Sequence, residues 1–397
     1  RTVFASDFGY DEEDSTACLQ RVLDSGAQRV IIDRMDGPWI TRPLFITNSN
    51  VTVLLEDGVV LMAKRGSFKG VSDCLVTVKG ASNVFLGSDG HAVLEMRKAD
   101  YCDPGKGYAP AEWRCALSLQ SSQDVTVRNL TLKSSGGDGV YVKGMKNVVL
   151  ENLVSIDNHR QGMSPIGVEG MSVRNCVFND TVGTAPQSGV DMEPNSASDA
   201  FTDVVYEDCT FNGNAGYGVK LDFHKLTGLS QPVSIVFMRC EMKNNSGNSG
   251  VFVVGGSQTV YGDAGPVTGS ILFEDCTVAG NANGAVRVSN LVEGGVTLAF
   301  RNCTFDARGM SASADEGFSL SEVFRNSGRF EDYVCEMIEQ IKLWFYSLLV
   351  MSVVLTGKAP YKKVVTYQYV KDENGEEFHK SGGNSLECQD VANKASA

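Results

Sequence analysis

The segment Val173-Arg174-Asn175-Cys176 is one copy of a short phrase that occurs seven times between residues 125 and 305. Each copy places Asn, Asp or another polar residue directly before Leu or Cys. The other copies are Val127-Arg128-Asn129-Leu130, Leu150-Glu151-Asn152-Leu153, Tyr206-Glu207-Asp208-Cys209, Phe237-Met238-Arg239-Cys240, Phe273-Glu274-Asp275-Cys276 and Phe300-Arg301-Asn302-Cys303. Successive copies are 23, 23, 33, 31, 36 and 27 residues apart. A repeat of this period, with strands separated by Gly and Asn turns, predicts a solenoid whose coils stack on one another.

The composition agrees with a chain of strands and tight turns. Its 397 residues exceed the usual size of one domain, but a solenoid grows along a single axis. The 42 glycines and 10 prolines indicate many tight turns. A net charge of −13 argues against a nucleic-acid partner, which needs a basic face, and weighs mildly against a polyanionic substrate.

No apolar stretch is long enough to cross a membrane as a helix. The longest, residues 343–355, has 13 residues, where roughly 18 are needed. Residue 1 is Arg and no signal peptide is visible, so we expect the numbered chain to be a mature or trimmed form.

Five of the eleven cysteines occupy the last position of the phrase in consecutive coils. Stacked coils would place them about 4.8 Å apart, the spacing of neighbouring strands. Small thiols fill a narrow interior corner well, so we expect a buried column of free cysteines rather than disulfides. No CxxC pair supports a zinc site.

Three regions are expected along the chain. Residues 1–50 form an N-terminal cap with a helix near Ser15–Leu23, whose apolar face is Ala17, Leu19, Val22 and Leu23. Residues 51–305 form the coils, interrupted by an aromatic-rich insertion near 97–115. Residues 306–397 form a C-terminal cap or extension, with a helix within 330–355, a strand at Lys363–Val370 and a disordered tail.

A second strand in each coil, introduced by Gly, is expected to carry the functional groups. Side chains alternate along a strand, so one set points inward and the other outward. The inward set is Val140, Val142, Met163, Val190, Met192, Val219, Leu221, Val251 and Val253. The outward set is Tyr141, Lys143, Ser164, Asp191, Glu193, Lys220, Asp222 and Phe252.

Stacking in register would gather charges on this face. Asp191 would lie about 5 Å from Lys220 on the next coil, and about 7 Å from Glu193 along its own strand. Glu193 would lie about 5 Å from Asp222. Like charges at this range raise one pKa, which keeps one carboxyl protonated as an acid and another ionised as a base. The alternative interpretation is a solvated charge ladder in which Lys220 only fixes the register.

Further candidates lie at the rim of the same face. Asp138 follows a Gly-Gly turn, His159, Arg160 and Gln161 precede the next strand, and His224 continues the parity of Asp222. In the insertion, Trp113 could stack on a sugar ring or pack the insertion against the coils. The expected substrate-binding residues are therefore Tyr141, His159, Arg160, Gln161, Ser164, Lys220, His224 and Trp113.

These coils, with the opening Asp7-Phe8-Gly9 and the phrase Ser49-Asn50-Val51-Thr52-Val53, resemble the right-handed parallel β-helix proteins of the pectin-lyase-like superfamily. The resemblance covers about residues 5–305 and implies an all-β, right-handed parallel β-helix. Polygalacturonases of this superfamily carry Asn-Thr-Asp, Asp-Asp, Gly-His-Gly and Arg-Ile-Lys motifs. Only Gly136-Gly137-Asp138 and Val219-Lys220-Leu221 echo the first and the last, so the resemblance does not imply galacturonan hydrolysis.

The leading hypothesis is a glycoside hydrolase acting on an oligo- or polysaccharide. Asp191 and Glu193 would be its acid and base, with Asp222 and Asp138 as alternatives. A lyase or epimerase acting on uronates is the second hypothesis, and a non-catalytic glycan-binding surface solenoid is the third.

No cofactor is required and no metal site is predicted, although outward carboxylates could bind Ca²⁺. We expect a secreted, periplasmic or cell-surface protein. The sequence predicts no oligomeric state.

Overall fold

The seven copies of the phrase mark the same corner of successive coils in the computed structural model. Val127 pairs with Leu150, Leu150 with Val173, and the register continues through every later copy to Phe300. The spacings read from the sequence are therefore the register of a parallel sheet. The polar residue of each copy has a left-handed backbone, with φ from 50° at Asn175 to 59° at Asn129. Asn and Asp tolerate this conformation better than other non-glycine residues, which explains their place in the phrase.

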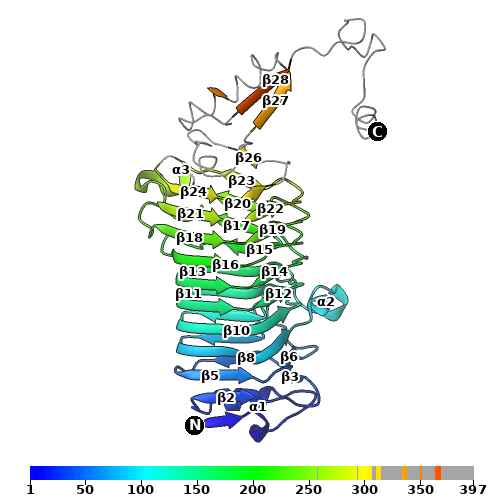
Figure 1. Ribbon diagram of the computed structural model, residues 1–397. Coiled ribbons are helices and arrows are strands. Elements are labelled where there is room, and N and C mark those ends of the chain that lie inside the picture. Colours follow the sequence, from blue (N-terminus) through cyan, green and yellow to red (C-terminus); the bar gives the residue numbers. More distant parts are fainter. Residues whose placement is uncertain are drawn as a thin grey trace, which may run out of the picture. The chain divides into compact units, whose positions relative to one another are not determined.

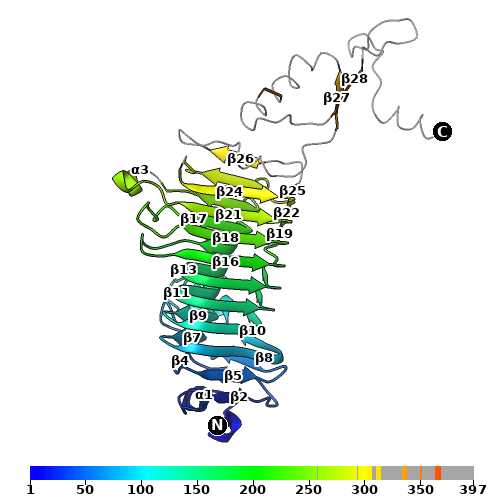
Figure 2. The ribbon, with the colours of Figure 1, turned by 60° about the vertical axis from the view of Figure 1, so that its left-hand side comes forward.

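The structure describes residues 1–256, 258–292, 294–305, 310–313, 333–337, 349–350 and 363–367. It divides into two units, Arg1–Ser327 and Gly328–Ala397, which are described separately. The first unit contains three long parallel ladders of strands, and Figures 1 and 2 show them stacked coil upon coil along one axis. The predicted right-handed parallel β-helix is confirmed.

Ladder 1 contains the strands that end in the repeated phrase. Parallel pairing joins each of its strands to the next along the axis. Its members are β1 (Thr2–Phe4), β2 (Arg29–Ile32), β5 (Val51–Leu55), β8 (Ser82–Glu95), β10 (Gln123–Lys133), β11 (Asp138–Glu151), β13 (Gln161–Arg174), β16 (Phe201–Glu207), β18 (Val233–Met238), β21 (Gly269–Glu274) and β24 (Val296–Arg301).

Ladder 2 follows the left-handed corner and consists of short strands. It also includes the second halves of β8 and β10. Its own members are β3 (Trp39–Thr41), β6 (Val60–Ala63), β12 (Val154–Ile156), β14 (Val177–Asn179), β19 (Glu241–Lys243), β22 (Thr277–Ala279) and β25 (Thr304–Phe305).

Ladder 3 is the sheet that the sequence predicted to carry the functional groups. It includes the first halves of β11 and β13. Its other members are β4 (Leu44–Ile46), β7 (Val76–Lys79), β9 (Leu117–Gln120), β15 (Ser188–Met192), β17 (Val219–Asp222), β20 (Val251–Val254), β23 (Val286–Ser289) and β26 (Met310–Ser313).

Short helices lie at the end and on the side of the coils. The predicted N-terminal helix is α1 (Thr16–Leu23), and it lies at the N-terminal end of the column (Figure 1). Its buried face includes Leu19, Val22 and Leu23 as predicted, but Cys18 takes the place expected for Ala17, which is exposed. The insertion contains α2 (Lys98–Tyr101) and the 3₁₀ helix η2 (Pro104–Lys106). The remaining elements are η1 (Ser6–Phe8), α3 (Gln258–Tyr261) and η3 (Gly262–Ala264).

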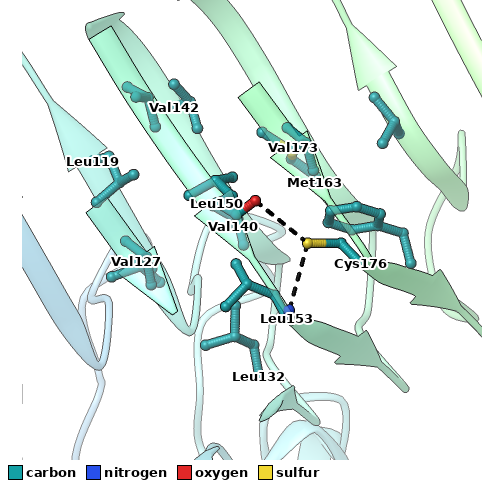
Figure 3. Packing of buried hydrophobic residues seen from close by; sticks show 14 of the residues in the cluster. Leu119, Val127, Leu132, Val140, Val142, Leu150, Leu153, Met163, Val173 and Cys176 are labelled. Atoms are coloured by element: carbon teal, nitrogen blue, oxygen red, sulfur yellow. Dashed lines mark hydrogen bonds between the residues drawn. The ribbon is translucent and has the colours of Figure 1, made fainter. Parts of the chain in front are cut away.

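The core repeats the same side chains at the same height in each coil. Tyr206, Phe237, Phe273 and Phe300 stack face to face, with ring centroids 4.7 to 4.8 Å apart. The five cysteines of the phrase are buried and free, as predicted. Figure 3 shows Cys176 packed among aliphatic side chains, where its Sγ lies 3.7 Å from the Leu150 oxygen and 3.4 Å from the Leu153 nitrogen.

Three buried asparagines, Asn214, Asn245 and Asn281, form a column in successive coils, at a turn other than the one that the repeated phrase marks. The Nδ2 of Asn214 donates to Asn245 Oδ1 at 3.0 Å, and the Nδ2 of Asn245 donates to Asn281 Oδ1 at 2.8 Å. Each Nδ2 also donates to a backbone oxygen of the preceding coil, that of Phe178, Phe211 or Met242. The three side chains are at most 1% exposed, so the column satisfies backbone groups that water cannot reach.

The second unit contains β27 (Tyr333–Met337) paired in parallel with β28 (Lys363–Tyr367). The strand predicted from Lys363 is confirmed over β28. The helix predicted within residues 330–355 is confirmed at residues 349 and 350, whereas residues 333–337 of that range form β27 and have a parallel partner. The predicted disordered tail lies outside the described residues.

The asparagine column gives a test of coil stability. We expect Asn245→Ala to lower the free energy of unfolding by about 2–4 kcal/mol, because it leaves buried amide groups of two coils without partners. Urea unfolding of the variant measures this loss. Ser246→Ala, at the exposed neighbouring position, should change stability by less than about 0.5 kcal/mol. Equal stability of the two variants would contradict the role of the column.

Candidate active site

The outward side chains of ladder 3 form one continuous row along the axis. Figure 1 shows β15, β17, β20 and β23 one above another, and the register pairs Asp191 with Lys220, Lys220 with Phe252 and Phe252 with Arg287. We call this set the outward row; its members are Thr77, Ser118, Tyr141, Ser164, Asp191, Lys220, Phe252 and Arg287. All nine side chains predicted to point inward are 0% exposed, so the predicted parity is confirmed.

Asp191 is the carboxylate of the outward row, and it is almost completely buried. It is 1% exposed, and its Oδ2 accepts a 2.9 Å hydrogen bond from Gln161 Nε2. Gln161 is held in turn, because its Oε1 accepts from the Ser188 backbone N–H at 2.9 Å. Among the described residues, no hydrogen bond reaches the other oxygen, Oδ1, which lies 3.4 Å from Lys220 Nζ.

Burial raises the pKa of Asp191 to about 7, because the protein interior disfavours its charged form. The Lys220 ammonium acts in the opposite direction, and the negative charge of Glu193 adds to the rise. An aspartic acid with this pKa holds its proton in a large fraction of molecules near neutral pH. Such a group can donate a proton to a substrate under mild conditions.

Lys220 joins Asp191 to a second carboxylate. Its Nζ lies 3.3 Å from Asp222 Oδ2, and the Nδ1 of His224 lies 2.6 Å from Asp222 Oδ1. Burial acts to lower the pKa of Lys220, but Asp191 and Asp222 outweigh it and the pKa is raised. Lys220 is therefore an ammonium ion, and each of the two carboxylates contacts it.

Glu193, Asp222 and His224 could together hold a cation. One ligand atom from each lies within 4.8 Å of the others. The Lys220 ammonium already contacts Asp222 from one side, so a metal ion there would be bound against a neighbouring positive charge.

Asp138 is placed differently from the other carboxylates. It is 0% exposed, and Arg160 donates to both of its oxygens at 2.9 Å. Arg160 also donates to Ser164 Oγ at 3.3 Å and lies 3.7 Å from Glu112 Oε1. Asp138 and Arg160 thus form a buried bidentate ion pair that fixes the rim of the face.

The insertion builds a cavity of about 670 Å³ beside this rim. Its lining includes Glu112, Trp113, His159 and Cys102, whose Sγ lies 3.3 Å from His159 Nδ1. Burial lowers the pKa of His159, which favours a neutral imidazole. Trp113 is 47% exposed and is available to a ligand.

Tyr101 and Tyr108, by contrast, pack the insertion. They are buried, with ring centroids 5.1 Å apart, and the Arg114 guanidinium lies 5.6 Å from both rings. These two rings therefore contribute to the packing of the insertion.

The remaining candidates are distributed along the row. Ser164 is buried and accepts a hydrogen bond from Arg160, and Tyr141 is half-buried, with its pKa raised to about 12 by burial.

Two groups were missed by sequence reasoning, Glu112 and Arg287. Glu112 lies in the insertion, where no repeat places it. Arg287 could have been found, because Gly284 and the alternation Val286-Arg287-Val288 repeat the pattern of the earlier coils.

The family model described as right handed beta helix region matches residues 46–264. The chain belongs to this family. Three solved structures with the same fold each cover 80% or more of this chain. An iota-carrageenase in complex with iota-carrageenan fragments has a TM-score of 0.56 at 12% identity, covering 80% of this chain and 92% of its own.

The other two likenesses are of similar extent. The endo-xylogalacturonan hydrolase from Aspergillus tubingensis has a TM-score of 0.51 at 14% identity, covering 84% of this β-helix protein and 87% of its own chain. The enzymatically active domain of bacteriophage CBA120 tailspike protein 2 has a TM-score of 0.51 at 11% identity, with coverages of 85% and 47%. At these identities the likeness shows the fold.

The end of the β-helix protein has different relatives. Residues 303–397 match the family model of class I tRNA synthetases (I, L, M and V). The isoleucine–tRNA ligase of Bacillus thuringiensis (strain Al Hakam) is 44% identical over 79 residues, which is 19% of this chain and 8% of the ligase. The chain thus spans less than a tenth of that relative. Among the described residues, no helix combines the length and apolar content needed to cross a bilayer.

The buried ion pair gives a prediction about the rim. Arg160→Met should lower the free energy of unfolding by about 3–5 kcal/mol, because it leaves Asp138 buried without its partner. Chemical denaturation measures the loss, and adding Asp138→Asn should restore part of it. Arg174→Met removes an exposed arginine that lies 3.5 Å from Glu207 and should cost less than about 1 kcal/mol. A similar loss in both single variants would contradict the assignment.

Proposed function

We propose that this β-helix protein is a glycoside hydrolase that acts on a polysaccharide laid along the outward row. The observation that carries the proposal is Asp191: a buried carboxyl with a pKa of about 7, one oxygen without a hydrogen bond and a second carboxylate across a shared ammonium. Paired carboxyl groups in different environments are the arrangement that glycosidic hydrolysis needs.

Asp191 is the proposed general acid. Its protonated form would donate to the glycosidic oxygen, so that the departing sugar leaves as a neutral alcohol. Gln161 holds the carboxyl in orientation through Oδ2, which leaves Oδ1 for the substrate. Since Asp191 is 1% exposed, the flexible Lys220 side chain must give way when substrate binds.

Asp222 is the proposed base, with Glu193 as the neighbouring carboxylate. Asp222 is more open than Asp191, since 14% of its side chain is exposed. When Asp222 is ionised, His224 Nδ1 must carry the hydrogen between them, which fixes the imidazole tautomer. The contacts with Lys220 place the two contacted oxygens of Asp191 and Asp222 no more than about 7 Å apart, a range that includes the separations of both retaining and inverting glycosidases.

One further observation weighs against two of the groups that a lyase could use as its base. Lys220 has a raised pKa and Arg160 is bound to Asp138, so neither is suited to take a proton from a uronate as a lyase base. The carrageenase and the xylogalacturonan hydrolase that share the fold are named for action on polysaccharides. The short similarity to isoleucine–tRNA ligases covers 8% of the ligase and carries no part of the proposal.

The first test is turnover of a glycan panel. Wild-type protein should release reducing ends from one polysaccharide class without an unsaturated product that absorbs in the near ultraviolet. Asp191→Asn should reduce the rate about a hundred- to ten-thousand-fold, because the proton donor is lost. Asp203→Asn, an exposed aspartate on ladder 1, is the matched control and should keep the wild-type rate. Unchanged turnover in Asp191→Asn would exclude its role, and ultraviolet absorbance would indicate a lyase.

The second test is the pH dependence of kcat/KM. The rate should fall as the pH rises through about 7, because Asp191 loses the proton that it donates. Lys220 lowers this pKa and Glu193 raises it. Lys220→Met should therefore move the alkaline limb to higher pH, and Glu193→Gln should move it to lower pH. A limb that stays fixed in both variants would show that another group titrates.

A further inference from the structure

The outward row continues past the carboxylates to a stacked group of three side chains. The ring of Tyr217, which precedes β17, lies 5.1 Å from the ring of Phe252 with an interplanar angle of 24°. The Arg287 guanidinium lies 4.7 Å from the centroid of Phe252. The register pairs Lys220 with Phe252 and Phe252 with Arg287, so Arg287 is two coils beyond Lys220 on the same row.

The contact with Phe252 positions the guanidinium of Arg287. The N–H donors of a guanidinium lie in its own plane, so contact with an aromatic face leaves donors free for another ligand. Arg287 is exposed, and no ion pair or side-chain hydrogen bond engages it within the described part of the chain. Four arginines in or next to strands of ladder 1 differ, because Arg128, Arg174, Arg239 and Arg301 each lie within 4.0 Å of a carboxylate. A positioned arginine without a protein partner is ready to bind an oxyanion through two parallel hydrogen bonds.

The local charge of the row supports the same ligand. The chain has a net charge of −13, yet the two charged members of the row beyond Asp191 are the cations Lys220 and Arg287. Neighbouring coils are about 4.8 Å apart, so these cations are about 10 Å apart along the axis. Arg287 is three coils, or about 14 Å, from Asp191 along the axis, so a sugar polymer lying on the row could contact both residues at once.

We propose that Arg287, supported by Phe252 and Tyr217, is a binding subsite for an acidic group of the polysaccharide, either a carboxylate or a sulfate ester. The inference rests on the proposed function in one respect, since it takes the outward row as the face that carries the polymer. It adds that the substrate is acidic and that its anionic group is recognised two coils beyond Lys220.

The test measures binding separately from turnover. Asp191→Asn protein is titrated by calorimetry with three probes of equal length: an oligogalacturonate, a sulfated galactan oligomer and a neutral glucan oligomer. At least one acidic probe should bind more tightly than the neutral one, with an affinity that falls as salt is added. Adding Arg287→Ala should weaken that binding at least about tenfold and leave the neutral probe unchanged.

The controls separate a specific contact from a loss of net charge or of fold. Arg301→Ala, on the exposed side of ladder 1, removes the same charge and should leave binding of the acidic probe unchanged. Arg287→Lys should give an intermediate affinity, because a lysine keeps the charge without the planar fork. Thermal melting checks that each variant is folded.

The outcomes also distinguish this inference from the proposed function. Preference for the carboxylated or the sulfated probe identifies the acidic group. Equal affinity for acidic and neutral probes, or an Arg287→Ala variant that binds like its parent, would overturn the subsite. Binding that depends on Arg287 in a protein that cleaves none of the panel would leave the subsite standing and reject the hydrolase.

Discussion

The parallel stacking of coils in register is the constraint on which the rest of the structure depends. Each coil lies one strand spacing above the last, so a residue meets the residue at the same position of its neighbours. The phenylalanine stack, the cysteine column and the asparagine column all follow from this rule. Aromatic rings gain contact at 4.7 Å, and a buried amide finds both a donor and an acceptor in the next coil.

The same constraint acts differently on the charged residues of the candidate site than on the apolar and amide groups of the core. Stacking in register is favourable for identical apolar or amide groups, but it would be costly for identical charges. On the outward row the two neighbouring charges are of opposite sign, because Asp191 lies beside Lys220, and the neutral Ser164 and Phe252 flank this pair. Lys220 offsets the charge of Asp191 and Asp222 without removing the desolvation of Asp191, whose pKa is therefore raised to about 7. A rigid scaffold can hold such an arrangement, because its coils cannot rearrange independently.

The insertion supplies what the regular coils cannot. Coils of equal length give a nearly flat face, whereas the insertion near 97–115 adds a cavity lined in part by Trp113 and places Glu112 beside Arg160. The last part of the chain is of another kind, since its relatives are tRNA synthetases and its two paired strands belong to a separate unit. The repeat pattern ends where that second likeness begins, at residue 303.

The sequence by itself determined the coil spacing, the cysteine column and the side of the sheet on which Asp191, Lys220 and Asp222 lie. These features are repeated, so local periodicity is enough to place them. Only the tertiary structure decided that Asp138 is bound by Arg160, that Asp191 is buried while Asp222 is more open, and that Arg287 rests on Phe252. Those contacts join non-repeating loops or side chains from different coils, and their burial depends on the packing of the whole face rather than on any local pattern.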